Sequence, residues 1–429
     1  EEGNAWTYNK STDSYYLHYF SRKQPDLNWE NPEVRQEIFD MMRFWFDKGI
    51  DGFRMDSISL IAKDPSFPLI DSKKYPDIFS FYAKEPRLHL YLHEMNRQVL
   101  SKYDCMSVGE GSAVMVDDVA KFVDPAREEL NMLYHFDAAR IRNTTLPDNP
   151  ESGIDYSLIA LKKMFTEWDK AVDKGWPSIY LGNHDQPRMV SRFGSDKDEF
   201  RALSAKMLIT FLLTMRGTPY WFAGDEIGMR NIRFDRIEDY NDIDTINRYK
   251  KAKAEGKDPQ AVLDEQKETG RDNARTPFQW DRSPEAGFTA GTPWLKVNPD
   301  YTWINVADEE KDPTSILNYF KKVVSFRKEN PSLIYGSYHL LDAENPQSYT
   351  FLRKTGADTY LIMLNFSPKA AISTPGIDMS NAHVLLDNYG DRSHMAPQKD
   401  ITLRPFEAIV FQLNHPVYES FIDSLDLLE

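Results

Sequence analysis

The sequence predicts an α/β fold of the (β/α)-barrel type, followed by a smaller all-β domain. Short apolar segments alternate with helical patterns along much of the 429 residues, which is the order of a parallel α/β architecture. Several of these segments end at polar residues, and (β/α) barrels build their active sites where the strands end. After Pro331 the apolar residues recur at every second position instead, which is typical of half-buried strands.

Composition excludes several classes of partner. The formal net charge of −15 argues against nucleic acid or an anionic membrane surface as a partner. No apolar run reaches the length that spans a membrane. The single cysteine, Cys105, rules out an internal disulfide. It precedes a predicted strand and is expected to be a buried packing residue.

A well-marked helix precedes the first strand of the predicted barrel. Asn31 can cap it, Pro32 fits its first turn, and Gly49 ends it. Its apolar face is predicted at helical spacing, with the residues Val34, Ile38, Met41 and Trp45. The strand that follows lies within GIDGFRMDSI, residues 49–58.

Arg54 and Asp56 stand two residues apart on this strand, so their side chains are expected to point the same way. A guanidinium beside a carboxylate favours the ionised form. An ionised aspartate at the end of a buried strand is what a covalent nucleophile requires. The alternative for these residues alone is a structural ion pair that ends the strand.

Further strands are predicted at residues 106–109, 130–136, 177–181 and 218–222. The first of these ends at Glu110, and the third leads to the adjacent His184 and Asp185. Two acids that flank a scissile bond are the machinery of glycoside hydrolysis. Glu110 has no basic neighbour in sequence, which fits a carboxyl kept protonated as the acid. Asp185 could stabilise oxocarbenium charge, and His184 could bind the same sugar ring.

These segments resemble the α-amylase family, glycoside hydrolase family thirteen, and within it the oligo-1,6-glucosidase and α-glucosidase branch. The resemblance rests on GFRMD (52–56), GE (109–110), NHD (183–185), QPDLN (24–28) and GRDNARTPFQW (270–280), and it extends over nearly the whole chain. It implies a (β/α)8 TIM barrel in which Asp56 is the nucleophile, Glu110 the acid/base and Asp185 the transition-state stabiliser. It further implies that Arg54, Ser57, Phe136, His184 and Arg271 bind substrate.

The resemblance also implies a domain plan. Residues 1–20 are expected to be a remnant of a protruding second domain, residues 21–335 the catalytic barrel with an insertion at 230–300, residues 336–414 a C-terminal β-sandwich, and residues 415–429 a tail. Strand ends correspond only to the fourth through eighth barrel strands, so a completing N-terminal segment is expected. No cofactor is expected for the chemistry, no metal is assigned to these residues, and a structural calcium would belong to that N-terminal part. A bacterial cytoplasmic location is expected.

Linkage and reaction type remain open at the sequence level. In this branch the residue after the nucleophile influences linkage: Ser57 favours α-1,4 or mixed specificity, whereas QPDLN favours α-1,6. Sucrose isomerases are also similar, but Ser112 and RIRNTT (140–145) depart from their pattern, so hydrolysis is favoured. Amylase-like ectodomains that only bind partners typically lose the catalytic acids, which are present here.

Two further elements are predicted near the C-terminus. A helix over residues 313–329 is expected to be capped by Asp312. The segment LRPFEAIVFQL, residues 403–413, is expected to form the last strand of the β-sandwich.

Overall fold

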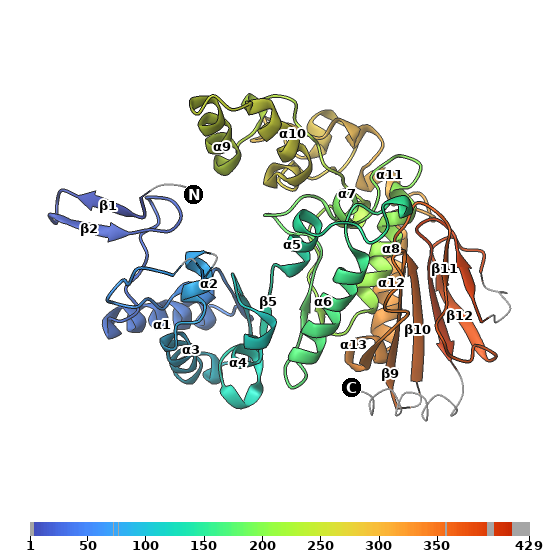
Figure 1. Ribbon diagram of the computed structural model, residues 1–429, viewed down its shortest axis with the longest axis horizontal. Helices are drawn as coiled ribbons and strands as arrows, with labels where there is room; N and C mark the ends of the chain where they lie inside the picture. The colour runs from blue at the N-terminus through green and yellow to red at the C-terminus, as the bar shows by residue number, and fades with distance from the viewer. Residues whose placement is uncertain (1–3, 72, 76, 357, 393–398, 414–429) are drawn as a thin grey trace. The chain divides into compact units, whose positions relative to one another are not determined.

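The computed structural model describes residues 4–71, 73–75, 77–356, 358–392 and 399–413. The chain divides into two units by its contacts (Figure 1). Unit 1 comprises Glu1–Phe136 and Glu167–Ser178, and unit 2 comprises Asp137–Thr166 and Ile179–Glu429.

Unit 1 is built on three short strands that pair in parallel, in the order β3–β4–β5. An antiparallel hairpin of β1 and β2 precedes them. The strands are β1 (Trp6–Asn9), β2 (Ser14–Leu17), β3 (Gly52–Met55), β4 (Met106–Glu110) and β5 (Met132–Tyr134). The helices are α1 (Pro32–Asp47), α2 (Ile78–Tyr82), α3 (Arg87–Gln98) and α4 (Ala120–Val123). The parallel pairing confirms the predicted α/β pattern for this unit.

Helix α1 begins and ends where the sequence predicts. The Asn31 side chain accepts a hydrogen bond from the Glu33 N–H at 2.9 Å, and Gly49 follows the helix with a φ of 93°, a conformation that glycine adopts without strain. The predicted apolar face is wrong in part: Val34 and Ile38 are half-buried, but the fully buried residues are Phe39, Met42 and Phe46. Met41 and Trp45 are exposed within the described residues. Apolar side chains surround much of this helix, so spacing alone could not select the packed face.

Unit 2 contains most of the helices and the C-terminal strands. Its helices are α5 (Asp137–Thr144), α6 (Leu158–Ala171, whose last residues belong to unit 1), α7 (Met189–Phe193), α8 (Arg201–Thr214), α9 (Ile243–Ala254), α10 (Pro259–Thr269), α11 (Val306–Glu309), α12 (Ile316–Glu329) and α13 (Ser332–Tyr335). Two further short strands, β6 (Ser178–Ile179, whose first residue belongs to unit 1) and β7 (Thr218–Pro219), pair with each other.

Helices α8 and α12 pack together, and α8 also contacts the sheet strands β10 and β14 (Figure 1). Helix α8 is buried nearly all round, because its residues are apolar on every face. Helix α12 begins three residues later than predicted, and its cap is Ser315, which accepts the Asn318 N–H at 3.1 Å. The Asp312 side chain instead accepts the N–H of Thr314 at 2.8 Å, which is a local turn contact that competes with capping.

Residues 337–413 contain a five-stranded antiparallel sheet in the order β12–β14–β10–β9–β8, beside a two-stranded sheet of β11 and β13. The strands are β8 (Ser337–Leu341), β9 (Ser348–Thr355), β10 (Asp358–Asn365), β11 (Ala371–Ser373), β12 (Ala382–Asp387), β13 (Ile401–Leu403) and β14 (Ala408–Leu413). Residues 403–413 are therefore not one strand. A turn separates β13 from β14, in which Phe406 has a φ of 50° and the Glu407 carboxylate accepts the Arg404 N–H at 2.7 Å. The predicted tail at 415–429 lies outside the described residues.

Two buried cations connect the helices of unit 2 to this sheet region. The Lys162 ammonium on α6 donates to the backbone carbonyls of Asp342, Asn345 and Ser348 at 2.9, 2.8 and 3.2 Å. The Arg353 guanidinium on β9 donates to the carbonyls of Thr214 and Gly336, both at 2.6 Å. Charged donors satisfy these carbonyls where strand or helix bonding does not.

No helix in the described residues is both long enough and apolar enough to cross a membrane.

Candidate active site

The end of β3 places Arg54 and Asp56 in direct contact, as strand alternation predicts. Arg54 Nη1 donates to Asp56 Oδ1 in an ion pair. The Asp56 side chain is 74% exposed, whereas that of Arg54 is 36% exposed. The nucleophile candidate is therefore open to solvent while its cationic partner is half-covered.

Glu110 at the end of β4 meets the same arginine. The strand register pairs Met55 with Gly109, which brings Glu110 beside the residues that follow β3. Arg54 Nη2 donates to Glu110 Oε2 at 2.7 Å, and the Ser57 N–H donates to that oxygen at 3.1 Å. Arg54, Asp56 and Glu110 form what we call the strand-end site.

The Glu110 carboxyl is buried, with 7% of the residue exposed. Burial raises the pKa of Glu110, as does the hydrogen bond that its protonated carboxyl donates to the neighbouring Asp56 carboxylate, while the Ser57 N–H and Arg54 oppose that rise. A raised pKa keeps a carboxyl protonated over a wider pH range, which is the property of a general acid.

Tyr134 and Phe136 lie at the end of β5. The Arg54 guanidinium lies over the Tyr134 ring at 5.4 Å, and the Phe136 ring meets Tyr134 edge-on at 6.0 Å. Sequence reasoning named Phe136 as substrate-binding and missed Tyr134. The position of Tyr134, opposite Glu110 in the register, could have indicated it. The role of Phe136 stays a prediction.

In unit 2 the loop after β6 carries His184 and Asp185. His184 Nε2 is 3.3 Å from Asp185 Oδ2, and the Asn183 side chain accepts the Asp185 N–H at 2.8 Å. Asp185 Oδ1 is 2.6 Å from Arg275 Nη2 and 3.6 Å from Arg271 Nη1. The predicted trio of His184, Asp185 and Arg271 therefore lies together.

A second carboxylate, Asp242, completes this cluster, which we call the loop site: His184, Asp185, Asp242, Arg271 and Arg275. Asp242 Oδ1 is 2.9 Å from Arg271 Nη2 and 3.8 Å from Arg275 Nη1. Asp242 also caps α9 through the Thr245 N–H at 3.0 Å. Sequence reasoning missed Asp242 and Arg275, although Arg275 stands in the same GRDNARTPFQW segment as Arg271.

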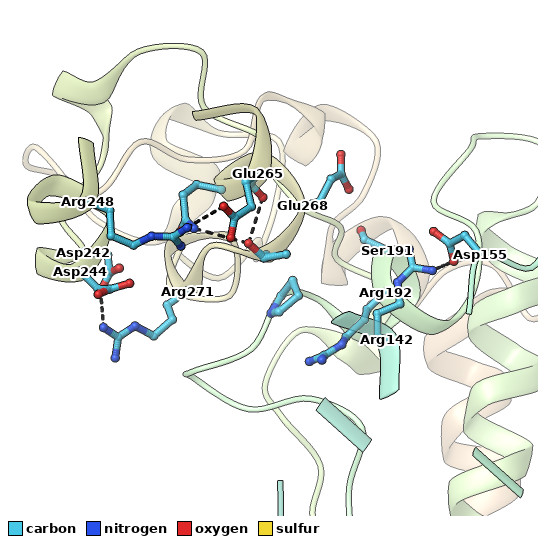
Figure 2. Close-up of a pocket in the computed structure, with 13 residues that line it drawn as sticks. Arg142, Asp155, Ser191, Arg192, Asp242, Asp244, Arg248, Glu265, Glu268 and Arg271 are labelled. Atoms are coloured by element: carbon cyan, nitrogen blue, oxygen red, sulfur yellow. Dashed lines mark hydrogen bonds and ion pairs between the residues drawn. The ribbon is translucent and has the colours of Figure 1, made fainter. Parts of the chain in front are cut away.

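A cavity of about 710 Å³ adjoins Arg271 and Asp242 within unit 2 (Figure 2). Its lining is rich in charged residues of both signs: Arg142, Asp155, Arg192, Asp242, Asp244, Arg248, Glu265, Glu268 and Arg271. The arginines already have acceptors. Arg142 contacts Asp155, Arg248 contacts Glu265 at 2.6 Å, and Arg192 donates to the Gln186 side chain. Such a wall offers donors and acceptors together, which suits a neutral, hydroxyl-rich ligand.

Among the residues that the structure describes, no group of three or more histidine, cysteine, aspartate or glutamate side chains could hold a metal ion.

Most glycoside hydrolases use a pair of acidic residues, and Asp56 and Glu110 form such a pair at the ends of neighbouring strands. A model of the alpha amylase catalytic domain matches residues 1–336. This chain is 48% identical to an oligo-1,6-glucosidase of Parageobacillus thermoglucosidasius and 44% identical to one of Bacillus cereus, covering 96% of this chain and 74% of each relative. The chain therefore belongs to the α-amylase family of glycoside hydrolases.

Solved structures agree with the family assignment. The isomaltulose synthase of Protaminobacter rubrum is 37% identical with a TM-score of 0.89, and the similarity covers 96% of this chain and 74% of that one. A trehalulose synthase in complex with Tris gives the same identity, TM-score and coverage. These neighbours support the TIM-barrel type of glycosidase fold for the catalytic part, with a sheet-rich region after it.

Proposed function

We propose that this chain acts as an exo-acting, retaining α-glucosidase on short gluco-oligosaccharides. The observation that carries the proposal is the strand-end site, in which one guanidinium bridges an exposed aspartate and a buried glutamate of raised pKa. The two carboxyls are thus neighbours, as the retaining mechanism requires. The oligo-1,6-glucosidase names of two relatives support glucose as the sugar released.

The reaction proceeds by double displacement. Asp56 attacks the anomeric carbon and forms a glycosyl ester while the glycosidic C–O bond breaks, and Glu110 gives its proton to the leaving oxygen. Glu110 then takes a proton from water, whose oxygen attacks the same carbon and releases Asp56. Glucose leaves with its α configuration retained.

The loop site holds the remaining residues to which the family resemblance assigns a role. We propose that Asp185 stabilises the positive charge of the oxocarbenium-like transition state, and that His184 and Arg271 bind sugar hydroxyls. The contacts of Asp185 with Arg271 and Arg275 support this role, because they fix the carboxylate in one orientation before substrate binds.

Both α-1,4 and α-1,6 linkages are proposed substrates. The oligo-1,6-glucosidase names of the relatives and the QPDLN segment favour α-1,6, whereas Ser57 favours α-1,4. The five short strands β3–β7 are proposed to supply the fourth through eighth strands of the family barrel.

Product analysis on maltose, isomaltose, sucrose and trehalose tests the proposal. Glucose released from maltose and isomaltose, with the α anomer seen first by NMR, is the expected result. Initial release of the β anomer, or no glucose from any of the four sugars, would overturn it.

Sucrose isomerisation is the second candidate, because structural neighbours with a TM-score of 0.89 include isomaltulose and trehalulose synthases. Formation of isomaltulose or trehalulose from sucrose faster than glucose would establish it instead.

A further inference from the structure

Ser57, the residue after Asp56, has a left-handed backbone, with a φ of 44° and a ψ of 32°. A non-glycine residue rarely takes this conformation, and a β-branched residue takes it with strain. The surrounding structure must therefore hold the backbone here.

The conformation directs the Ser57 N–H at the carboxyl of Glu110. The N–H donates to Glu110 Oε2 at 3.1 Å, and Arg54 Nη2 donates to the same oxygen at 2.7 Å. The Ser112 hydroxyl is 3.4 Å from the other oxygen, Oε1. Residue 57 thus contacts Glu110 through its backbone N–H and not through its side chain.

The turn that carries this N–H is fixed to the segment around Glu110. Ile58, Ser59 and Leu60 are buried, at 5%, 0% and 5% exposed. The Ser59 hydroxyl donates to the Ser112 carbonyl at 2.8 Å. A side chain at Gly109 would come within 2.8 Å of the Ile58 Cγ2 atom, so the two segments lie as close as glycine permits. Glu110 and the Ser57 N–H therefore keep their relative positions.

We propose that Ser57 is a positioning residue for Glu110, because its left-handed backbone holds an N–H against the carboxyl of the proposed acid/base. The type of residue at position 57 then affects the reaction through backbone conformation and not only through contact with sugar. The inference rests on the proposed function of Glu110 as the general acid.

The effect has a definite sign on pH dependence. Within unit 1, Glu110 faces Arg54 and Asp56 from the end of β3 and Tyr134 from β5. The Ser57 N–H bond favours the ionised carboxylate and so lowers the pKa of Glu110 against the larger effect of burial. Weakening this bond raises the pKa of Glu110 further, so the alkaline limb of activity moves to higher pH.

Four variants separate backbone conformation from side-chain size and polarity. Ser57→Gly and Ser57→Asn keep the left-handed backbone readily, whereas Ser57→Thr and Ser57→Val are β-branched and resist it. Asn and Thr form the matched polar pair. The measurement is the pH profile of kcat/KM on maltose, whose leaving sugar needs a proton and whose alkaline limb therefore reports the acid in the free enzyme.

We expect the midpoint of the alkaline limb to move to higher pH by about 0.4 to 1 unit in the Thr and Val variants. This shift corresponds to the loss of one ordinary hydrogen bond. The Gly and Asn variants should keep the limb of the parent. Equal limbs in all four variants, or shifts that follow side-chain size instead of β-branching, would overturn the inference.

A second measurement does not depend on activity. Infrared titration of protein labelled with ¹³C-glutamate, taken as a difference against Glu110→Gln, follows the Glu110 carboxyl directly. A higher titration midpoint in Ser57→Val than in Ser57→Gly supports the positioning role even if no sugar is hydrolysed. Identical midpoints in an active enzyme would reject the positioning role and leave the proposed function standing.

Discussion

The strand-end site and the loop site each hold two carboxylates, but they differ in the number of cations. At the strand-end site Arg54 contacts both Asp56 and Glu110 and is the cation found there among the described contacts. At the loop site Arg271 and Arg275 each lie within 4 Å of both Asp185 and Asp242. One site therefore has an excess of one negative charge, and the other is balanced.

This difference separates two kinds of chemistry. A single cation cannot neutralise two carboxylates, so a proton on the buried one relieves the repulsion, and Glu110 is the buried member. Such a site is suited to proton transfer. At the loop site two guanidiniums contact both carboxylates and hold them in place, which suits electrostatic stabilisation of a transition state.

Removing the exposed carboxylate at the strand-end site should have the largest effect. We expect Asp56→Ala to lower kcat by about 10⁴-fold or more, because no covalent intermediate can form. Mass spectrometry after incubation with a slow-reacting fluoroglucoside should detect the glycosyl-enzyme in the parent and not in the variant. Near-parental turnover in the variant would refute the nucleophile assignment. Asp51→Ala, at an exposed position before β3, is the matched control.

Removing the proton from the same site should have a substrate-dependent effect. We expect Glu110→Gln to lower kcat/KM on maltose by about 10²- to 10⁴-fold, and far less on a glucoside whose leaving group needs no protonation. The comparison of the two substrates is the measurement. A uniform loss on both would contradict the acid role. In the parent, the raised pKa of Glu110 predicts activity that persists well above the usual range of a glutamic acid and falls as Glu110 ionises.

Removing one cation from the loop site should lower activity less than either change at the strand-end site. Arg275→Ala removes the 2.6 Å contact with Asp185 and the 2.8 Å bond to the His184 carbonyl. We expect kcat/KM to fall roughly 10- to 100-fold, the equivalent of one charged hydrogen bond. Arg275→Lys should recover part of this loss because it keeps the cation. Equal activity of the Ala and Lys variants would show that charge balance is not what the site requires.

The smallest effect is expected for the buried ion pair of Arg188 and Asp225 in unit 2. Burial raises the pKa of Asp225 to about 7 despite Arg188, whose Nη1 lies 3.7 Å from Asp225 Oδ1. A raised folded pKa stabilises the fold below the unfolded pKa of 3.8, and this contribution is lost as the pH rises through about 7. The unfolding free energy of Asp225→Asn should therefore increase relative to that of the parent as the pH rises from 5 to 8.

Urea unfolding at the two pH values measures this change in unfolding free energy. The exposed Asp264→Asn is the control and should show no comparable change. A stability difference for Asp225→Asn that stays constant with pH would contradict the assigned titration.

Local rules predicted the contacts between residues close in sequence. Arg54 and Asp56 meet because side chains alternate along a strand, and Asn31 caps α1 because its side chain reaches the next turn. Glu110 also lies at the end of β4 and Asp185 in the loop after β6, as the strand pattern predicts, and their catalytic roles stay predictions. These features depend on a few adjacent residues, so they can be predicted from a single sequence.

Contacts across long separations could not be predicted in the same way. Arg54 and Glu110 are 56 residues apart, and Arg275 and Asp185 are 90 residues apart. Only the register of β3 with β4 and the path of the 270–280 segment bring these pairs together. The face of α1 failed for a related reason, because Phe39 and Trp45 are equally apolar and only tertiary packing decides between them.

The buried Lys162 ammonium bears on how unit 2 unfolds. Its three carbonyl partners belong to the sheet region, and it lies on a helix of the preceding region. Separating the two regions would leave a charge and three carbonyls without partners in an apolar surface. The boundary near residue 336 therefore divides two architectures but not two cooperative units, and a single unfolding transition is expected for both.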